Sequence, residues 1–208
     1  MYEKGVFASM KKEVYTSDVY TSFQNFELDN LFSREVILEL GSGNGVFLVH
    51  LGRTFKDKNV IGIELDIKRA KKCYKKISRE GLENTFVFSG DAKEIIPLFF
   101  PSSVVSKTFM LFPDPWPKSS TWRNRLFEIS SAIMVDRISK VGATFNLVTD
   151  VEYIFSEVNE LFTKVLGNWD FSDEGLFEFR KLFVPTLYYE KWLSEGRNFY
   201  WGVWIKKF

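Results

Sequence analysis

The sequence is poor in the residues that build disulfide and metal sites. It contains one cysteine, Cys73, and one histidine, His50, among 208 residues. A single cysteine excludes an internal disulfide, and a lone histidine without cysteine partners does not form the ligand sets typical of zinc sites. We therefore expect no metal, and we interpret Cys73 and His50 as structural residues within helices.

Long apolar runs are also missing. No stretch approaches the roughly 20 apolar residues of a membrane-spanning helix, and residues 1–10 lack the apolar segment of a signal peptide. The sequence thus predicts a soluble, cytoplasmic protein with no membrane partner. An excess of charge of one sign is missing too, since the formal net charge is +1. The chain as a whole does not indicate a nucleic-acid partner, and any basic surface must be local.

What the sequence does contain, from residue 36 onward, is an alternation of short apolar runs and helical patterns. This alternation is typical of an α/β fold in which helices cover both faces of a mostly parallel sheet. We predict one domain over residues 1–208, with an irregular arm at 1–33. The expected strands are 36–40, 59–63, 85–88, 104–112, 142–149, 176–183 and 199–206, and the longer helices are 67–80, 125–139 and 151–165.

The first strand runs into a glycine turn that predicts the cofactor. Gly41, Gly43 and Gly45 alternate directly after Glu39, whereas a dinucleotide fold needs the spacing G-x-G-x-x-G. A carboxylate beside the turn would repel a phosphate, but it suits a ligand that carries an ammonium and a sulfonium group. At the end of the second strand, Glu64 is suited to accept both hydroxyls of an adenosine ribose. Glu39 and Glu64 together favour S-adenosylmethionine over NAD as the ligand.

Two further features leave alternatives open. Asp91 and Ala92 follow the third strand, where the acid either meets the adenine amino group or caps the next helix. The helix at 67–80 carries seven basic residues against one acid, Glu80. This bias indicates either a solvated helix face or a footprint for a phosphate backbone.

The fourth strand leads into a proline-rich loop, Phe-Pro-Asp-Pro-Trp-Pro-Lys, at residues 112–118. Three prolines exclude a helix and stiffen the loop. They hold Asp114, Trp116 and Lys118 at the carboxyl edge of the sheet, where open α/β sheets bind ligands. Packing alone explains such a loop poorly.

At this point the chain resembles the bacterial tRNA (guanine-N7)-methyltransferases from roughly residue 35 to its end. The resemblance rests on the glycine turn with its two glutamates, the loop at 112–118, Thr149-Asp150 and the stretch 185–191. It implies a Rossmann-like class I methyltransferase fold with seven strands and an antiparallel last strand. It also implies methyl transfer from S-adenosylmethionine to N7 of a guanine in the tRNA variable loop, which forms 7-methylguanosine.

The resemblance also implies roles for individual residues, with Asp114 as the acid beside the reacting centre. The methyl-donor pocket would comprise Glu39, Gly41, Gly43, Gly45, Glu64, Asp91, Ala92 and Asp114. Contacts to tRNA or its guanine would come from Lys118, Asp150, Thr186, Leu187, Tyr188, Tyr189 and Glu190.

The chain departs from the family pattern at two places. Residues 119–125 lack most of the lysines, histidines and arginines that usually follow Lys118, and Tyr189 stands where the family has a glutamate. Either Glu190 replaces that glutamate by a local shift, or Tyr189 stacks on a base. Rival hypotheses are a methyltransferase for a small molecule or protein, and an inactive RNA-binding member of the fold. The oligomeric state, monomer or homodimer, stays open.

Overall fold

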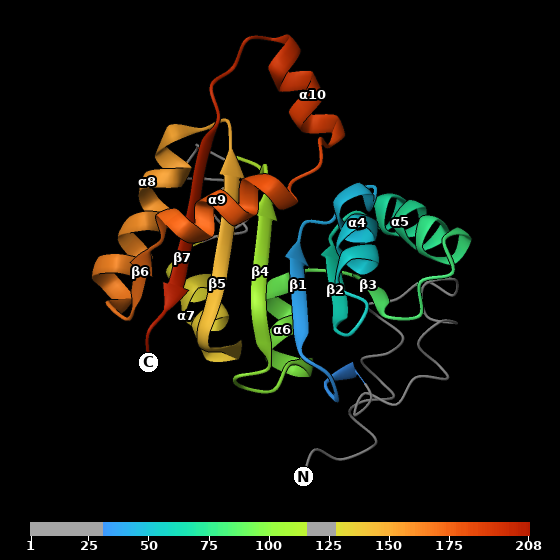
Figure 1. The fold of residues 1–208 in the computed structure, drawn as a ribbon, viewed down its shortest axis with the longest axis horizontal. Coiled ribbons are helices and arrows are strands. Elements are labelled where there is room, and N and C mark those ends of the chain that lie inside the picture. The colour runs from blue at the N-terminus through green and yellow to red at the C-terminus, as the bar shows by residue number, and fades with distance from the viewer. Residues whose placement is uncertain (1–30, 116–127) are drawn as a thin grey trace.

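The structure, a computed structural model, describes residues 31–115 and 128–208. In these residues one sheet has the strand order β3-β2-β1-β4-β5-β7-β6 (Figure 1). Strands β1 to β5 pair in parallel, and β7 runs antiparallel to both β5 and β6, which confirms the predicted sheet. The strands are β1 Val36–Leu40, β2 Asn59–Glu64, β3 Thr85–Ser89, β4 Val105–Leu111, β5 Ser139–Thr149, β6 Trp169–Phe171 and β7 Tyr200–Lys206.

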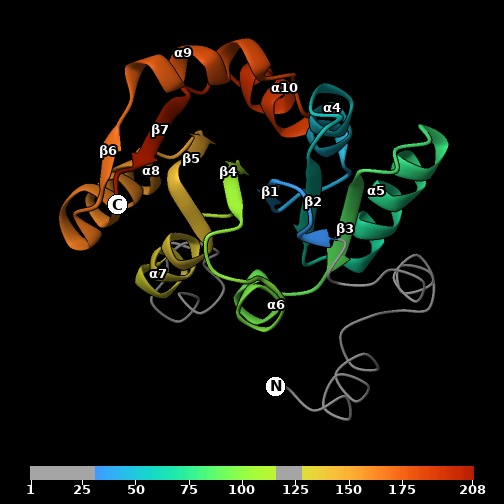
Figure 2. The same cartoon turned by 60° about the horizontal axis from the view of Figure 1, so that its bottom comes forward.

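Helices cover both faces of the sheet, as Figure 2 shows. Successive strand residues point to opposite faces, so Ile37 packs in one apolar layer and Leu38 in the other. Both layers exclude water, which explains why the central strands are continuous apolar runs. One layer contains α4 Val46–Thr54, α5 Ile67–Arg79 and α9 Asp173–Leu182, and the other contains α6 Ala92–Phe99, α7 Ile129–Ile138, α8 Glu152–Glu160 and the π-helix η2 Leu161–Leu166.

The order of the strands creates a crevice at the carboxyl edge. The chain runs from β1 outward through β2 and β3, then returns to place β4 on the other side of β1. The connections after β1 and β4 therefore leave the sheet in opposite directions, and ligands of open α/β sheets bind at such a point. Helix α10, Leu187–Ser194, lies beyond the tips of these strands in Figure 1.

The predicted strand at 176–183 is wrong, because this segment lies mostly in α9. Ser172 caps the helix by accepting a hydrogen bond from the Gly175 N–H, with acids in the first turn and bases in the last. Each feature stabilises a helix end. Leu176 and Phe179, three residues apart, both contact the apolar layer, as the helical period requires. The strand that precedes β7 is β6.

The remaining predicted elements are present with shifted ends. β5 begins at Ser139 rather than 142, and the helix at 151–165 is divided into α8 and η2. Of the helix predicted at 125–139, the structure describes the part from Ile129. Residues 1–30 of the predicted arm lie outside the described residues. Within 31–115 and 128–208, no helix has the length and apolarity to cross a membrane.

Candidate active site

The glycine turn between β1 and α4 has a backbone conformation that other residues rarely adopt. Gly41, Gly43 and Gly45 have φ angles of 74°, 55° and 73°, in the region that favours glycine. A Cβ at Gly45 would lie 2.4 Å from Cys73 Sγ, because α5 passes against the turn. A Cβ at Gly43 would meet no atom within 4 Å. The turn is thus tightly packed on its α5 side and open at Gly43.

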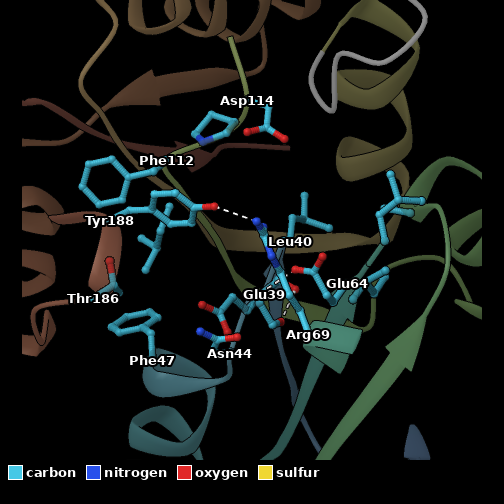
Figure 3. Close-up of a pocket in the computed structure, with 18 of the residues that line it drawn as sticks. Glu39, Leu40, Asn44, Phe47, Glu64, Arg69, Phe112, Asp114, Thr186 and Tyr188 are labelled. Atoms are coloured by element: carbon cyan, nitrogen blue, oxygen red, sulfur yellow. Dashed lines mark hydrogen bonds between the residues drawn. The ribbon is translucent and has the colours of Figure 1, made fainter. Parts of the chain in front are cut away.

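The turn forms part of the wall of a cavity of about 660 Å³ at the carboxyl ends of β1, β2 and β4. This volume lies in the range of ordinary small-molecule sites. The carboxylates of Glu39, Glu64 and Asp114 come from three different segments and surround the cavity (Figure 3). Ten predicted site residues line it: Glu39, Gly41, Gly43, Glu64, Asp91, Ala92, Asp114, Thr186, Leu187 and Tyr188.

Glu39 is a buried carboxyl in the cavity wall. Its side chain is 2% exposed, and its Oε2 has no hydrogen-bond partner in the described part of the chain. Burial raises the pKa of Glu39 to about 8, the nearby Glu64 carboxylate adds to the rise, and Ser42 opposes it. A buried carboxylate without a partner is costly, and a cationic group would remove that cost. The position therefore suits a ligand ammonium group.

Glu64, at the end of β2, holds the glycine turn in place. The Gly43 N–H donates to Glu64 Oε2 at 2.6 Å, and the Asp66 N–H donates to Oε1 at 2.9 Å. A carboxylate has about four acceptor positions in all. Two of them organise the backbone, and the remaining capacity is available to hydroxyl groups such as those of a ribose.

Asp91 follows β3 and caps α6. The Lys93 N–H donates to Asp91 Oδ1 at 2.8 Å, which confirms the capping interpretation. Asp91 and Ala92 also line the cavity. The contact of Asp91 with an adenine amino group stays a prediction alongside its role as a cap.

The segment after β4 turns sharply to bring Asp114 to the cavity. Phe112 has a φ of 50°, a left-handed conformation that costs a non-glycine residue about 1–3 kcal/mol. Its ring is held by Phe199 at 5.7 Å and Tyr189 at 6.3 Å between ring centroids. Asp114 itself is exposed to solvent and lines the cavity. The packed aromatic rings thus stabilise a strained turn that carries the acid.

The amino end of α10 lies across the cavity from the glycine turn. Thr186 caps the helix by accepting from the Tyr189 N–H at 3.3 Å, and Leu187 and Tyr188 line the cavity. Arg69 Nη2 of α5 donates to the Tyr188 hydroxyl oxygen at 2.8 Å. This bond connects two helices that are 119 residues apart in sequence.

Other predicted site residues lie away from the cavity wall. Asp150 Oδ2 pairs with Arg197 Nη1 at 2.5 Å, and the Tyr189 ring stacks on Phe199 with centroids 4.7 Å apart. Glu190 is exposed on α10, and Gly45 contacts α5. Lys118 and Trp116 lie outside the described residues.

Sequence reasoning missed three cations of the cavity wall, Arg69, Lys93 and Lys191. Arg69 was visible only as one of seven bases on its helix, although its position just after the strand that ends in Glu64 is a usable signal. Lys191 ends the stretch 185–191 that carries the family resemblance, but that resemblance assigned it no role. Among the described residues, no group of His, Cys, Asp and Glu is arranged to hold a metal ion.

Comparisons with known proteins show the family of this chain. A family model described as "Putative methyltransferase" matches residues 33–201. A tRNA (guanine-N(7)-)-methyltransferase of Ruegeria sp. is 32% identical over 79% of this chain and 65% of its own length. Its counterpart in Thermotoga maritima is 30% identical over 85% of this chain and 57% of its own length. The chain thus spans less than two thirds of the length of these two relatives.

Solved structures agree on the fold. The 16S rRNA methyltransferase KamB superposes with a TM-score of 0.59 at 20% identity, covering 92% of this chain and 94% of that one. Identity this low supports the fold alone, whereas the family model and the two relatives match along most of the sequence. The chain belongs to the tRNA (guanine-N(7)-)-methyltransferase family.

Proposed function

We propose that this protein transfers the methyl group of S-adenosylmethionine to N7 of a guanine in the variable loop of tRNA, in the cytoplasm. The observation that carries the proposal is the cavity, which combines Glu64, Asp114 and the open position at Gly43 with the buried Glu39, whose Oε2 has no hydrogen-bond partner among the described residues. The relatives' names supply the substrate.

The residues of the cavity fit the methyl donor. Glu39 would hold the ammonium group, Glu64 the ribose hydroxyls, and Asp91 with Ala92 the adenine, while Gly43 allows close approach. The orphaned Glu39 Oε2 supports this fit, because a buried carboxylate gains most from a cation. When bound, S-adenosylmethionine supplies an electrophilic methyl carbon on a positively charged sulfur.

The acceptor needs no proton removed before it reacts. Guanine N7 carries a lone pair on the major-groove edge of the base. That pair forms the new bond to the methyl carbon, and the electrons of the sulfur–carbon bond leave with the sulfur. The positive charge therefore moves from the sulfur to the guanine, and a strong general base is unnecessary. The chain's task is to align the two atoms, and alignment can lower the barrier by about 7–11 kcal/mol.

Asp114 would hold the acceptor. Its carboxylate is suited to accept hydrogen bonds from guanine N1 and N2 and to stabilise the positive charge that develops on the base. The target base must leave its stacked position to reach the cavity, at a cost of a few kcal/mol. Thr186, Leu187 and Tyr188 at the rim are suited to receive it.

The test is methyl transfer from a labelled donor to total tRNA, followed by nucleoside analysis. We expect label in 7-methylguanosine. Asp114→Ala should abolish transfer while calorimetry still detects donor binding, and Asp114→Asn, which keeps the shape but not the charge, should remain below about 1% of the unaltered rate. An active Asp114→Ala protein would contradict the role of this acid.

The same assay separates the rival functions. Label in small molecules or protein would indicate another class of methyltransferase on the same fold. RNA binding without any transfer would indicate an inactive RNA-binding member. Either result would contradict the proposal.

A further inference from the structure

Aromatic rings and cations alternate along one side of α10 and just past its carboxyl end. The rings of Tyr188 and Trp192 stack with centroids 6.3 Å apart and planes 29° apart. The Arg197 guanidinium carbon lies 3.6 Å from the Trp192 ring centroid, and Lys191 Nζ lies 4.1 Å from it. The four side chains form a continuous row, which we call the α10 row.

The α10 row begins at the cavity. Tyr188 and Lys191 both line the cavity, and the Arg69 guanidinium carbon lies 5.7 Å from the Tyr188 ring centroid while Nη2 bonds to its hydroxyl (Figure 3). Trp192 and Arg197 continue the row away from the cavity toward Asp150. An RNA strand with one base in the cavity would therefore have its neighbouring nucleotides over this row.

Core packing accounts for only part of the row, because Trp192 is half-buried against the apolar layer of α4, α5 and α9, whereas Tyr188, Lys191 and Arg197 are exposed. Every residue of α10 keeps part of its side chain exposed. Leu187 is 60% and Leu193 55% exposed, beside Tyr188 at 38%. Large apolar and aromatic side chains gathered on one exposed helix beside an active site are typical of a binding surface.

We propose that the α10 row is a stacking platform for the unpaired nucleotides that flank the target guanine. This inference rests on the proposed function, because it takes RNA as the substrate. Rings and guanidinium planes stack on bases of any sequence, and cations between them hold phosphates. Asp150 and Glu195 balance the charge of Arg197, so Arg197 offers chiefly its plane, whereas Lys191 offers charge.

The chemistry of the row favours RNA over an acidic peptide. Either would match the cations, but only a nucleic acid uses flat rings at successive positions. The neighbouring helix supplies a second match, because α5 exposes Lys68, Lys72, Lys75 and Arg79 at the spacing of one helical stripe. Phosphates of the adjoining RNA stem would lie along that stripe.

The experiment measures binding of unmodified tRNA to the full chain by fluorescence anisotropy. Trp192→Ala should weaken binding about 10-fold, the loss expected for one stacked base, and Trp192→Phe should restore most of it. The matched control is Phe177→Ala on α9, where Lys181 Nζ likewise lies 3.9 Å from the ring centroid but the pair is away from the cavity. This control should bind tRNA like the unaltered protein.

A second variant tests the charge of the row. Lys191→Gln should reduce the slope of log affinity against log salt by about 1, as for one lost phosphate contact. Unchanged affinity in Trp192→Ala, an unchanged slope in Lys191→Gln, or equal competition by polyglutamate would overturn the platform. If Trp192→Ala does not fold, as judged by thermal melting, the Lys191→Gln slope decides.

The outcomes separate the platform from the function. If the unaltered protein binds tRNA without transferring a methyl group, the proposed function fails, and a loss of affinity in Trp192→Ala still supports the platform. If the unaltered protein methylates tRNA and the variants bind as tightly as it does, the platform alone fails.

Discussion

The buried carboxyl of Glu39 gives a quantitative prediction about stability. In the unfolded chain Glu39 has a pKa near the ordinary 4.5, whereas burial raises its pKa to about 8 in the folded protein. Between these values the folded protein holds a proton that the unfolded chain has lost. The free energy of unfolding must therefore fall as the pH rises from 4.5 to 8, and level off above 8.

The size of the effect follows from the difference in pKa. Each unit of difference corresponds to about 1.4 kcal/mol, so Glu39 should cost the ligand-free protein about 5 kcal/mol above pH 8. Glu39→Gln keeps the shape and cannot ionise. At pH 8.5 the variant should be more stable by about 3–5 kcal/mol, which is at least about 6 °C in melting temperature for a chain of this size. At pH 4.5 the two proteins should differ little.

Urea unfolding followed by circular dichroism between pH 4.5 and 9 measures this difference. Calorimetry adds a second readout, because a donor ammonium group that pairs with Glu39 at pH 7 should displace close to one proton. The variant should release none and bind the donor more weakly. Parallel stability profiles for the two proteins, or equal proton release, would refute the reasoning.

Three further predictions follow from particular contacts. Gly45→Ala should destabilise the protein by about 2–4 kcal/mol in urea unfolding, because its Cβ meets α5 and its φ is positive, whereas Gly142→Ala, with open space around it, should cost only about 1–2 kcal/mol. Asp91→Ala should lower the free energy of unfolding by about 1 kcal/mol, because it removes the cap of α6, and should also weaken donor binding in calorimetry. Asp66→Ala, which removes the cap of α5, should lower only the free energy of unfolding. Lys72→Gln should lower the salt slope of tRNA binding by about 1, and an unchanged slope would exclude α5 from the RNA surface.

Local sequence determined the part of the site that lies at the carboxyl ends of the parallel strands. A glycine turn after one strand and an acid after the next must meet, because the carboxyl ends of parallel strands share an edge. Glu39, Gly43 and Glu64 were therefore predictable as one group, and the Glu64–Gly43 hydrogen bond shows that the glycine turn and the acid at the end of β2 meet. The antiparallel β7 was expected only from the resemblance to a family.

The sequence misled where two structures fit the same apolar residues. Residues 176–183 contain enough phenylalanine and leucine to suit a strand, but the cap at Ser172 and the charges at both ends favour the helix that forms. Short apolar runs are ambiguous in this way, because a strand and a buried helix both need apolar side chains.

Tertiary structure alone decided the contacts between distant segments. The Arg69–Tyr188 bond, the pairing of Asp150 with Arg197 and the stacking of Tyr189 on Phe199 each depend on where α10 and β7 lie. No local pattern specifies such partners, because the packing of the whole sheet determines where the two partners lie relative to each other. The sequence by itself therefore determined which chemistry meets at the carboxyl edge, and the fold decided which carboxyl is buried without a partner and which rings remain exposed beside it.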